Sequence, residues 1–171
     1  QLVEDEKLVT GLSERELTSP EGAGFDLRLG KVHRLFGSGY LGIIERRTPD
    51  IKTLLTYPQD EGKPFSIDPG KAILVTTVES VNLPKYLTAI LQPRSTLYRS
   101  GIILRGGNIA PGYRGELSFL LYNSTERNNF EIEIGARMVH ILFFEVSGGT
   151  NPYRGQWQDG RINNPQSEIQ T

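Results

Sequence analysis

Two arginines and three aliphatic hydroxyl groups gather in one short stretch, Gln92-Pro93-Arg94-Ser95-Thr96-Leu97-Tyr98-Arg99-Ser100-Gly101. The planar guanidinium groups of Arg94 and Arg99 match the geometry of phosphate oxygens. Ser95 and Thr96 add neutral donors that can follow charge as it develops on a bridging oxygen. The composition therefore indicates a phosphate-binding loop. It also fits a solvated loop after a strand, because Arg-Ser pairs are common in ordinary turns.

A glycine-rich segment follows, Gly106-Gly107-Asn108-Ile109-Ala110-Pro111-Gly112-Tyr113-Arg114-Gly115-Glu116. Its four glycines let the backbone approach a ligand closely, and a tyrosine that rises from such a loop can stack on a ring-shaped group. The segment therefore fits a ligand-binding hairpin. A β-turn with a packing tyrosine fits it equally well.

Two further segments carry polar side chains that could bind a ligand. In Ala23–Leu29, Asp26 and Arg28 share one face of a strand, where they could serve a site or form a simple salt bridge. The segment Pro152-Tyr153-Arg154-Gly155-Gln156-Trp157-Gln158 holds the only tryptophan. It fits ligand binding as well as a tail that docks its aromatic rings on its own domain.

The two histidines, His33 and His140, could act as bases or metal ligands. His140 lies in the apolar run Met138–Phe144, where a partly buried imidazole with satisfied hydrogen bonds is the favoured interpretation.

Short strands must position these residues, because 19 glycines and 10 prolines separate brief runs of β-branched and aromatic residues. This texture predicts an all-β fold. The alternation in Phe130–Ile134 predicts one face in a core and one in water, and Ser13 to Glu16 has the spacing of a capping box before a short helix. The expected strands are Phe25–Leu29, Val32–Phe36, Tyr40–Glu45, Ala72–Glu79, Leu87–Gln92, Gly101–Leu104, Glu116–Tyr122, Phe130–Ile134 and Arg137–Val146.

Composition excludes several classes of function. The chain of 171 residues has no cysteine, which removes disulfides, thiolate metal sites and cysteine nucleophiles. Its 19 Lys and Arg balance 20 Asp and Glu, so no positive field attracts nucleic acid or an anionic membrane. No apolar run approaches the roughly 20 residues that cross a bilayer, and no signal peptide is evident. We therefore expect a cytoplasmic protein that binds neither nucleic acid nor membranes.

Taken in order, the segments resemble the five motifs of the dUTPase/dCTP deaminase superfamily, and among its members the archaeal-type dUTPases. The resemblance spans roughly Ala23 to Gln158. The matching segments are Ala23–Arg28, Pro93–Leu97 with Arg99, Ile109–Glu116, Arg137–Phe143 and Pro152–Gln158. His140 departs from the fourth motif, where the family usually has Gln.

The resemblance implies a distorted jelly-roll (a dUTPase-like β-clip) that assembles as a homotrimer with active sites between subunits. It implies a β domain over residues 1–147 and a flexible segment, 148–171, that closes over the nucleotide. The implied activity is hydrolysis of dUTP to dUMP and pyrophosphate, in nucleotide metabolism and dUMP biosynthesis. Mg²⁺ is held mainly by the triphosphate, with no direct protein ligand and with Asp26 as a structural or water-mediated partner.

The resemblance also implies the site residues. Arg94, Ser95 and Arg99 would contact phosphates, Tyr113 would pack on deoxyribose and exclude a 2′-hydroxyl, and Arg154 with Gln158 would close over the nucleotide. Ser95, Asp26 and the position of Ala110 are the catalytic candidates. The remaining substrate-binding candidates are Thr96, Asn108, Glu116, His140 and Tyr153.

Two departures bear on the chemistry. Deaminases of the family carry a proton-shuttling Glu where this chain has Leu120, and dUTPases carry a water-positioning Asp where it has Ala110. A leucine cannot transfer protons, which disfavours a dCTP deaminase or a bifunctional enzyme that forms dUMP. Ala110 fits an engineered inactivation, a change compensated by Glu116 or Asp26, or a form that binds dUTP without hydrolysing it. An interaction module without nucleotide binding is the fourth alternative.

Overall fold

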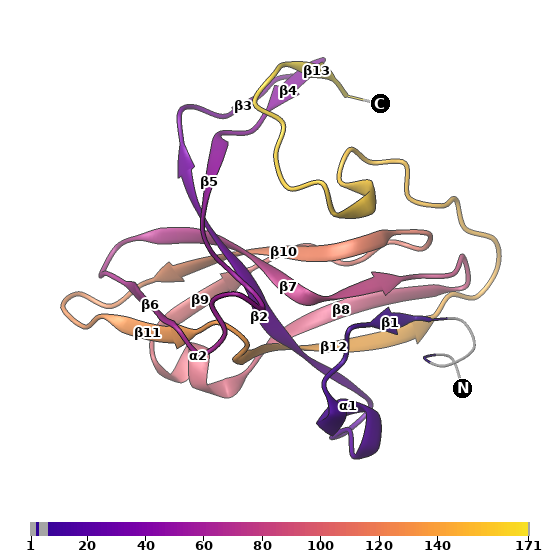
Figure 1. Cartoon of the computed structure of the whole chain (residues 1–171). Coiled ribbons are helices and arrows are strands. Elements are labelled where there is room, and N and C mark those ends of the chain that lie inside the picture. The colour runs from indigo at the N-terminus through magenta and orange to yellow at the C-terminus, as the bar shows by residue number, and fades with distance from the viewer. Residues whose placement is uncertain (1–2, 4–6, 171) are drawn as a thin grey trace.

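The computed structural model describes residue 3 and residues 7–170. Residues 1, 2 and 4–6 of the predicted β domain (1–147) and residue 171 of the predicted C-terminal segment (148–171) lie outside the described residues. The regular structure of the described residues is almost entirely β-strand, which confirms the all-β prediction (Figure 1). The strands are Val9–Thr10 (β1), Gly24–Phe36 (β2), Tyr40–Leu41 (β3), Glu45–Arg47 (β4), Asp50–Thr56 (β5), Pro64–Ile67 (β6), Ala72–Asn82 (β7), Leu87–Pro93 (β8), Ile102–Arg105 (β9), Arg114–Asn123 (β10), Phe130–Glu133 (β11), Arg137–Glu145 (β12) and Glu168–Ile169 (β13). The helices are Glu14–Thr18 (α1), Ser95–Arg99 (α2) and the 3₁₀ turn Gln158–Gly160 (η1).

One large antiparallel sheet organises the molecule. Its strand order is β8-β12-β2-β7-β10-β9, with β1 added beside β7 and β5 beside β2. Two small sheets, β11-β6 and β13-β4-β3, complete the fold. Figure 1 shows the β13-β4-β3 sheet standing away from the main body, beyond the ends of β2 and β5.

The core lies between the folded faces of the large sheet. Leu27, Val75, Leu121, Val139 and Ile141, from four different strands, are each 0% exposed. Each buried side chain of this size stabilises the fold by about 1.5–3 kcal/mol relative to exposure. In β11 the predicted alternation is confirmed, because Ile132 is buried between two exposed glutamates.

The two strands predicted over Phe25–Leu29 and Val32–Phe36 form one long strand, β2, so this prediction was wrong. Gly30, which was expected to separate them, lies at a register shift between β2 and β7. A Cβ atom there would lie 2.5 Å from the carbonyl oxygen of Thr77. The glycine therefore allows close approach of a neighbouring strand instead of ending its own.

The predicted strand Tyr40–Glu45 is also wrong, because the chain reverses within it to form the hairpin of β3 and β4. The turn contains apolar residues, which hide it from a turn prediction. Strands β1, β5, β6 and β13 were not predicted. Strands β5 and β6 contain Asp50, Lys52 and Pro64, which are residue types with low β-propensity, so the local sequence does not predict a strand. Pairing with a neighbouring strand stabilises the extended conformation there.

The predicted helix is present as α1, but its capping box is not formed. Ser13 occupies the N-cap position and makes no side-chain cap bond. The Glu16 carboxylate instead accepts a hydrogen bond of 2.9 Å from the backbone N–H of Asp26, and Glu16 is 1% exposed. The distant donor, the N–H of Asp26, thus replaces the local donor of a capping box, the N–H of Ser13, and it ties the helix to the start of β2.

Residues 148–170 lie along the large sheet and end in β13, which pairs with β4. Closure of this segment over a nucleotide stays a prediction. None of the helices in the described part of the chain has the length and apolar character needed to span a membrane.

We predict that His33 makes the stability of the fold depend on pH. Its ring is 2% exposed, its Nδ1 lies 2.9 Å from the Thr53 hydroxyl, and its Nε2 has no hydrogen-bond partner among the described residues. Burial, assisted by the charge of Lys31, lowers the pKa of His33 from 6.5 to about 4. Between these pH values the unfolded chain binds this proton and the folded chain does not, so stability is full above 6.5 and is lost as the pH falls toward 4.

The loss from this residue should reach about 3 kcal/mol at pH 4. Denaturant unfolding at pH 7, 5.5 and 4 measures the free energy of unfolding. We expect this free energy to fall clearly less between pH 7 and pH 4 in His33→Gln than in the parent. His140→Gln, which removes the other imidazole, should show the same fall as the parent. An identical pH dependence in the parent and His33→Gln would contradict this assignment.

Candidate functional site

Asp26 on β2 is the centre of a buried charge cluster. Its carboxylate accepts hydrogen bonds from Arg94 and from Arg137, the latter at 2.9 Å, and its Oδ1 lies 2.9 Å from Nδ1 of His140. Asp26 is 3% exposed, whereas the side chains of Arg94 and Arg137 are about one-third exposed. The carboxylate therefore fixes two guanidinium groups whose other faces remain accessible.

Asp26 and Arg28 do not form the salt bridge considered from the sequence. Arg28 pairs with Glu79 of β7, with 2.7 Å between Nε and Oε1, and also stacks over the ring of Tyr57. Glu79 is 0% exposed, and burial raises the pKa of its carboxyl against the opposing effect of Arg28. Asp26 is therefore paired with residues of β12, and Arg28 is paired with a residue of β7.

The phosphate-binding candidates lie at and around α2. Arg94 occupies the N-cap position, and Ser95, Thr96 and Arg99 are exposed. Arg94 and Thr96 line a cavity of about 440 Å³, here called the α2 cavity. Its remaining lining residues are Pro64, Leu97, Phe130, Glu131, Ile132, Glu133, Ala136 and Arg137.

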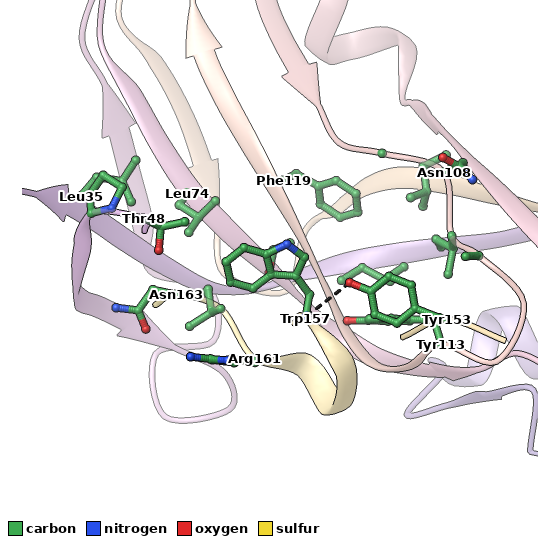
Figure 2. A pocket seen from close by; sticks show the side chains of 18 residues that line it. Leu35, Thr48, Leu74, Asn108, Tyr113, Phe119, Tyr153, Trp157, Arg161 and Asn163 are labelled. Carbon is green, nitrogen blue, oxygen red and sulfur yellow. Dashed lines mark hydrogen bonds between the residues drawn. The ribbon is translucent and has the colours of Figure 1, made fainter. Parts of the chain in front are cut away.

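A second cavity, of about 540 Å³ and here called the tail cavity, lies between the large sheet and the C-terminal segment. Four sequence-predicted residues line it: Asn108, Ala110, Tyr113 and Tyr153. Figure 2 shows the indole of Trp157 between the sheet residues Leu74 and Phe119 on one side and the tyrosine pair on the other. The other lining residues are Leu35, Thr48, Pro49, Leu91, Gly107, Ile109, Leu117, Ser118, Arg161, Ile162 and Asn163.

The glycine-rich hairpin and the C-terminal segment hold each other in place. Gln158 donates to the carbonyl of Gly112 at 2.9 Å and accepts from the N–H of Arg114 at 3.1 Å. A Cβ atom at Gly115, whose φ is +125°, would lie 2.2 Å from the backbone nitrogen of Gly160. Glycine is therefore required where η1 touches β10.

Two aromatic rings form the wall of the tail cavity nearest this junction. The rings of Tyr113 and Tyr153 meet edge to face with centroids 5.4 Å apart, and the Tyr153 hydroxyl accepts a 3.2 Å bond from the N–H of Trp157. The Tyr113 hydroxyl donates to the carbonyl of Glu116 at 2.7 Å, and burial raises its pKa to about 12. Tyr113 therefore remains a neutral donor that rigidifies the hairpin.

The lining of the tail cavity contains no carboxylate, and Arg161 is its one charged residue. Leu120 lies on β10 opposite Leu74 and Arg105, so the described chain offers no acid at that position either. Glu116 stands outside the lining, with both carboxylate oxygens held by Lys31 at 2.7 and 2.9 Å. The cavity suits a flat, neutral ring more than it suits acid–base chemistry.

The two groups of predicted residues do not meet within one copy of the chain. The α2 cavity and the tail cavity share no lining residue. Asp26 and His140 belong to the cluster beside the α2 cavity, whereas Arg154 is exposed and lines neither cavity. A ligand with a ring and a triphosphate would need both groups.

Sequence reasoning missed several residues of these cavities. Arg137 contacts Asp26, and its place three residues before His140 in an apolar strand was the available signal. Thr48, Arg161 and Asn163 reach the tail cavity from segments without a recognisable motif (Figure 2). No local pattern could have placed them there.

A protein-built metal site does not fit the described residues. They contain no group of three His, Asp or Glu side chains that could hold an ion. Asp26, the expected water-mediated partner of Mg²⁺, is already bound by two guanidinium groups and an imidazole. We therefore assign no step to a metal held by the protein.

Comparison with known proteins identifies a family and several relatives that this chain resembles. A family model described as dCTP deaminase-like matches residues 2–146. The chain is 35% identical over 144 residues to a protein of Methanothermobacter thermautotrophicus named "Probable deoxyuridine 5'-triphosphate nucleotidohydrolase", covering 84% of this chain and 89% of that protein. It is 30% identical over 163 residues to the "dCTP deaminase, dUMP-forming" of Persephonella marina, covering 94% and 88%.

Solved structures share the fold at lower identity. The 2'-deoxycytidine 5'-triphosphate deaminase from Agrobacterium tumefaciens superposes with a TM-score of 0.63 at 18% identity, over 85% of this chain. The match spans 46% of that longer structure. The predicted jelly-roll of the superfamily is thereby confirmed, and the extent of the family match shows that the chain belongs to the dCTP deaminase-like family, within the dUTPase/dCTP deaminase superfamily.

Proposed function

We propose that the chain is a dUTP diphosphatase that binds dUTP well and hydrolyses it slowly. The observation that carries this proposal is the lining of the tail cavity, which offers aromatic rings and amides but no carboxylate. Such a lining can hold a deoxyuridine ring without supplying a group for proton transfer at the base. The relative from Methanothermobacter named as a probable nucleotidohydrolase also supports the proposal.

In this proposal the ring and sugar occupy the tail cavity, with Tyr113 against the deoxyribose. The triphosphate reaches Arg94, Ser95, Thr96 and Arg99. Because Arg94 and Thr96 line a separate cavity, we propose that a second copy supplies this group of residues. A homotrimer with sites between subunits is the assembly we propose.

Attack on a phosphate requires an oriented water molecule, and the lining of the tail cavity contains no carboxylate that could orient it. Ala110 lines the tail cavity where the resemblance places a water-positioning Asp. Glu116 is held by Lys31, and Asp26 is held by Arg94 and Arg137. Neither compensates for Ala110 in this arrangement, so we expect binding to exceed catalysis. Mg²⁺, which neutralises phosphate charge when bound, would arrive with the triphosphate.

Deamination of dCTP is the second candidate, because a dUMP-forming dCTP deaminase is among the relatives. It would need a proton shuttle at the base. Leu120 and the lining of the tail cavity offer none among the described residues. We therefore rank it below dUTP hydrolysis.

The first test of the proposed function concerns Ala110. Ala110→Asp should raise the rate of pyrophosphate release from dUTP with Mg²⁺ by about 10²-fold, because the new carboxylate can orient water. Ala110→Asn, which has the same size without the charge, should stay near the parent rate. Ammonia release from dCTP should be absent in all three proteins.

Fast hydrolysis by the parent, unchanged in Ala110→Asp, would show that another group activates the water. Ammonia release from dCTP by the parent would favour the deaminase.

The second prediction uses Trp157 as a reporter, since it is the only tryptophan and lines the tail cavity. Titration with dUTP or deoxyuridine should change its fluorescence. Arg99→Ala should raise the Kd for dUTP by about tenfold, the value of one charge-assisted hydrogen bond, and Arg99→Lys should raise it less. The Kd for deoxyuridine, which lacks phosphate, should not change in either variant. Equal losses for both ligands would contradict a phosphate-binding role.

A further inference from the structure

The tail cavity has two chemically different ends. Figure 2 shows Tyr113 and Tyr153 on one side of the Trp157 indole. Thr48 and Asn163 lie on its other side, and both line the cavity although neither belongs to the five motif segments. The cavity therefore combines an aromatic end with a polar end whose role the motifs do not explain.

Thr48 is held in place at the polar end by the C-terminal segment. Its N–H donates to the carbonyl of Asn164 at 2.9 Å, and its Oγ1 accepts a 2.7 Å bond from the N–H of Asn164. Asn164 is 5% exposed, so this junction is buried. The proton of the Thr48 hydroxyl goes to no other residue in the part of the chain that the structure describes, and it is available to a ligand in the cavity.

The side-chain amide of Asn163 has a fixed orientation. Its Nδ2 donates to Oδ1 of Asp50 at 3.1 Å, and the same oxygen accepts a 2.8 Å bond from the N–H of Ile51. An ionised carboxylate only accepts hydrogen bonds, so the NH₂ half of the amide must face Asp50. The Oδ1 of Asn163 accepts no bond from residues 7–170 and presents a fixed acceptor to the cavity.

The charge at this end is already balanced. Arg161, which also lines the cavity, donates to Oε2 of Glu168 at 3.2 Å. A ligand at the polar end therefore meets one neutral donor, from Thr48, and one neutral acceptor, from Asn163.

We propose that Asn163 selects uracil over cytosine, with Thr48 as a supporting donor. This assignment rests on the proposed function, in which the sugar lies against Tyr113. The base then lies against the indole of Trp157, and its edge meets the polar end. In that position the N3–H of uracil donates to Oδ1 of Asn163, and the oxygen at position 4 accepts from Thr48.

Cytosine presents the opposite pattern at both positions, because its N3 is an acceptor and its position 4 carries an amino donor. The N3 lone pair would face the fixed acceptor of Asn163, and this oxygen would lose its bond. The Thr48 hydroxyl can rotate to accept from the amino group, so Thr48 discriminates less than Asn163 does. A site built to bond an N–H group rejects the analogue that lacks it.

The test compares binding of two nucleotides by isothermal titration calorimetry. The probes are the α,β-imido analogues of dUTP and dCTP with Mg²⁺, because the bridging nitrogen resists hydrolysis. The parent should bind the uracil analogue about tenfold or more tightly than the cytosine analogue, the value of one hydrogen bond. Asn163→Ala should raise the Kd of the uracil analogue by about tenfold and leave the Kd of the cytosine analogue within about twofold, so the preference is lost.

Thr48 and a remote amide provide the controls. Thr48→Val should weaken binding of the uracil analogue, whereas Thr48→Ser, which keeps the hydroxyl, should bind like the parent. Asn129→Ala removes an exposed amide outside both cavities and should change neither Kd. Circular dichroism verifies that each variant is folded.

The ratio of the two Kd values separates recognition from a structural role. Equal weakening of both analogues by Asn163→Ala, or an unchanged ratio, would overturn the assignment. A parent that binds both analogues equally would also overturn it and would leave nucleotide binding in place. A parent that binds neither analogue would overturn the proposed function and this assignment with it.

Discussion

The buried carboxylate of Asp26 is the constraint on which the candidate site depends. Two guanidinium groups and one imidazole converge on it from β12 and from the end of β8, while the backbone N–H of Asp26 bonds to Glu16. Removing one partner from such a buried pair typically costs about 3–5 kcal/mol, because the remaining charge stays buried. The carboxylate of Asp26 therefore joins β2 to β12 and to the end of β8 and fixes Arg94 and Arg137 at the α2 cavity, while the backbone N–H of the same residue ties the N-terminal helix to β2.

The tail cavity depends on a different constraint, the close approach of the C-terminal segment to the glycine-rich hairpin. Gly115 admits the backbone of η1, and Gln158 bonds to the backbone groups on both sides of Tyr113, the carbonyl of Gly112 and the N–H of Arg114. Tyr113 gives its proton to the hairpin itself. The cavity is consequently shaped by backbone contacts and aromatic rings, and its lining contains no carboxylate. The lining of the tail cavity thus suits contact with a ring and offers no group for acid–base chemistry.

The two cavities share no lining residue, so the proposed function requires an assembly in which the tail cavity of one copy lies near the α2 cavity of another. Each cavity is lined by only part of the groups that the proposed nucleoside triphosphate would need. The proposed function therefore includes a second copy that supplies the missing groups.

The sequence by itself determined the all-β class and the family, because five ordered motifs and the period-two alternation in Phe130–Ile134 are local features. It identified Arg94, Asp26, Tyr113 and Gln158 as candidates. Only the tertiary structure decided their partners, since Asp26 meets residues 68, 111 and 114 positions away. Strands β5 and β6, the hairpin with isoleucines in its turn, and the displaced bond of Glu16 were likewise decided by neighbours distant in sequence, because pairing and burial outweigh local preference.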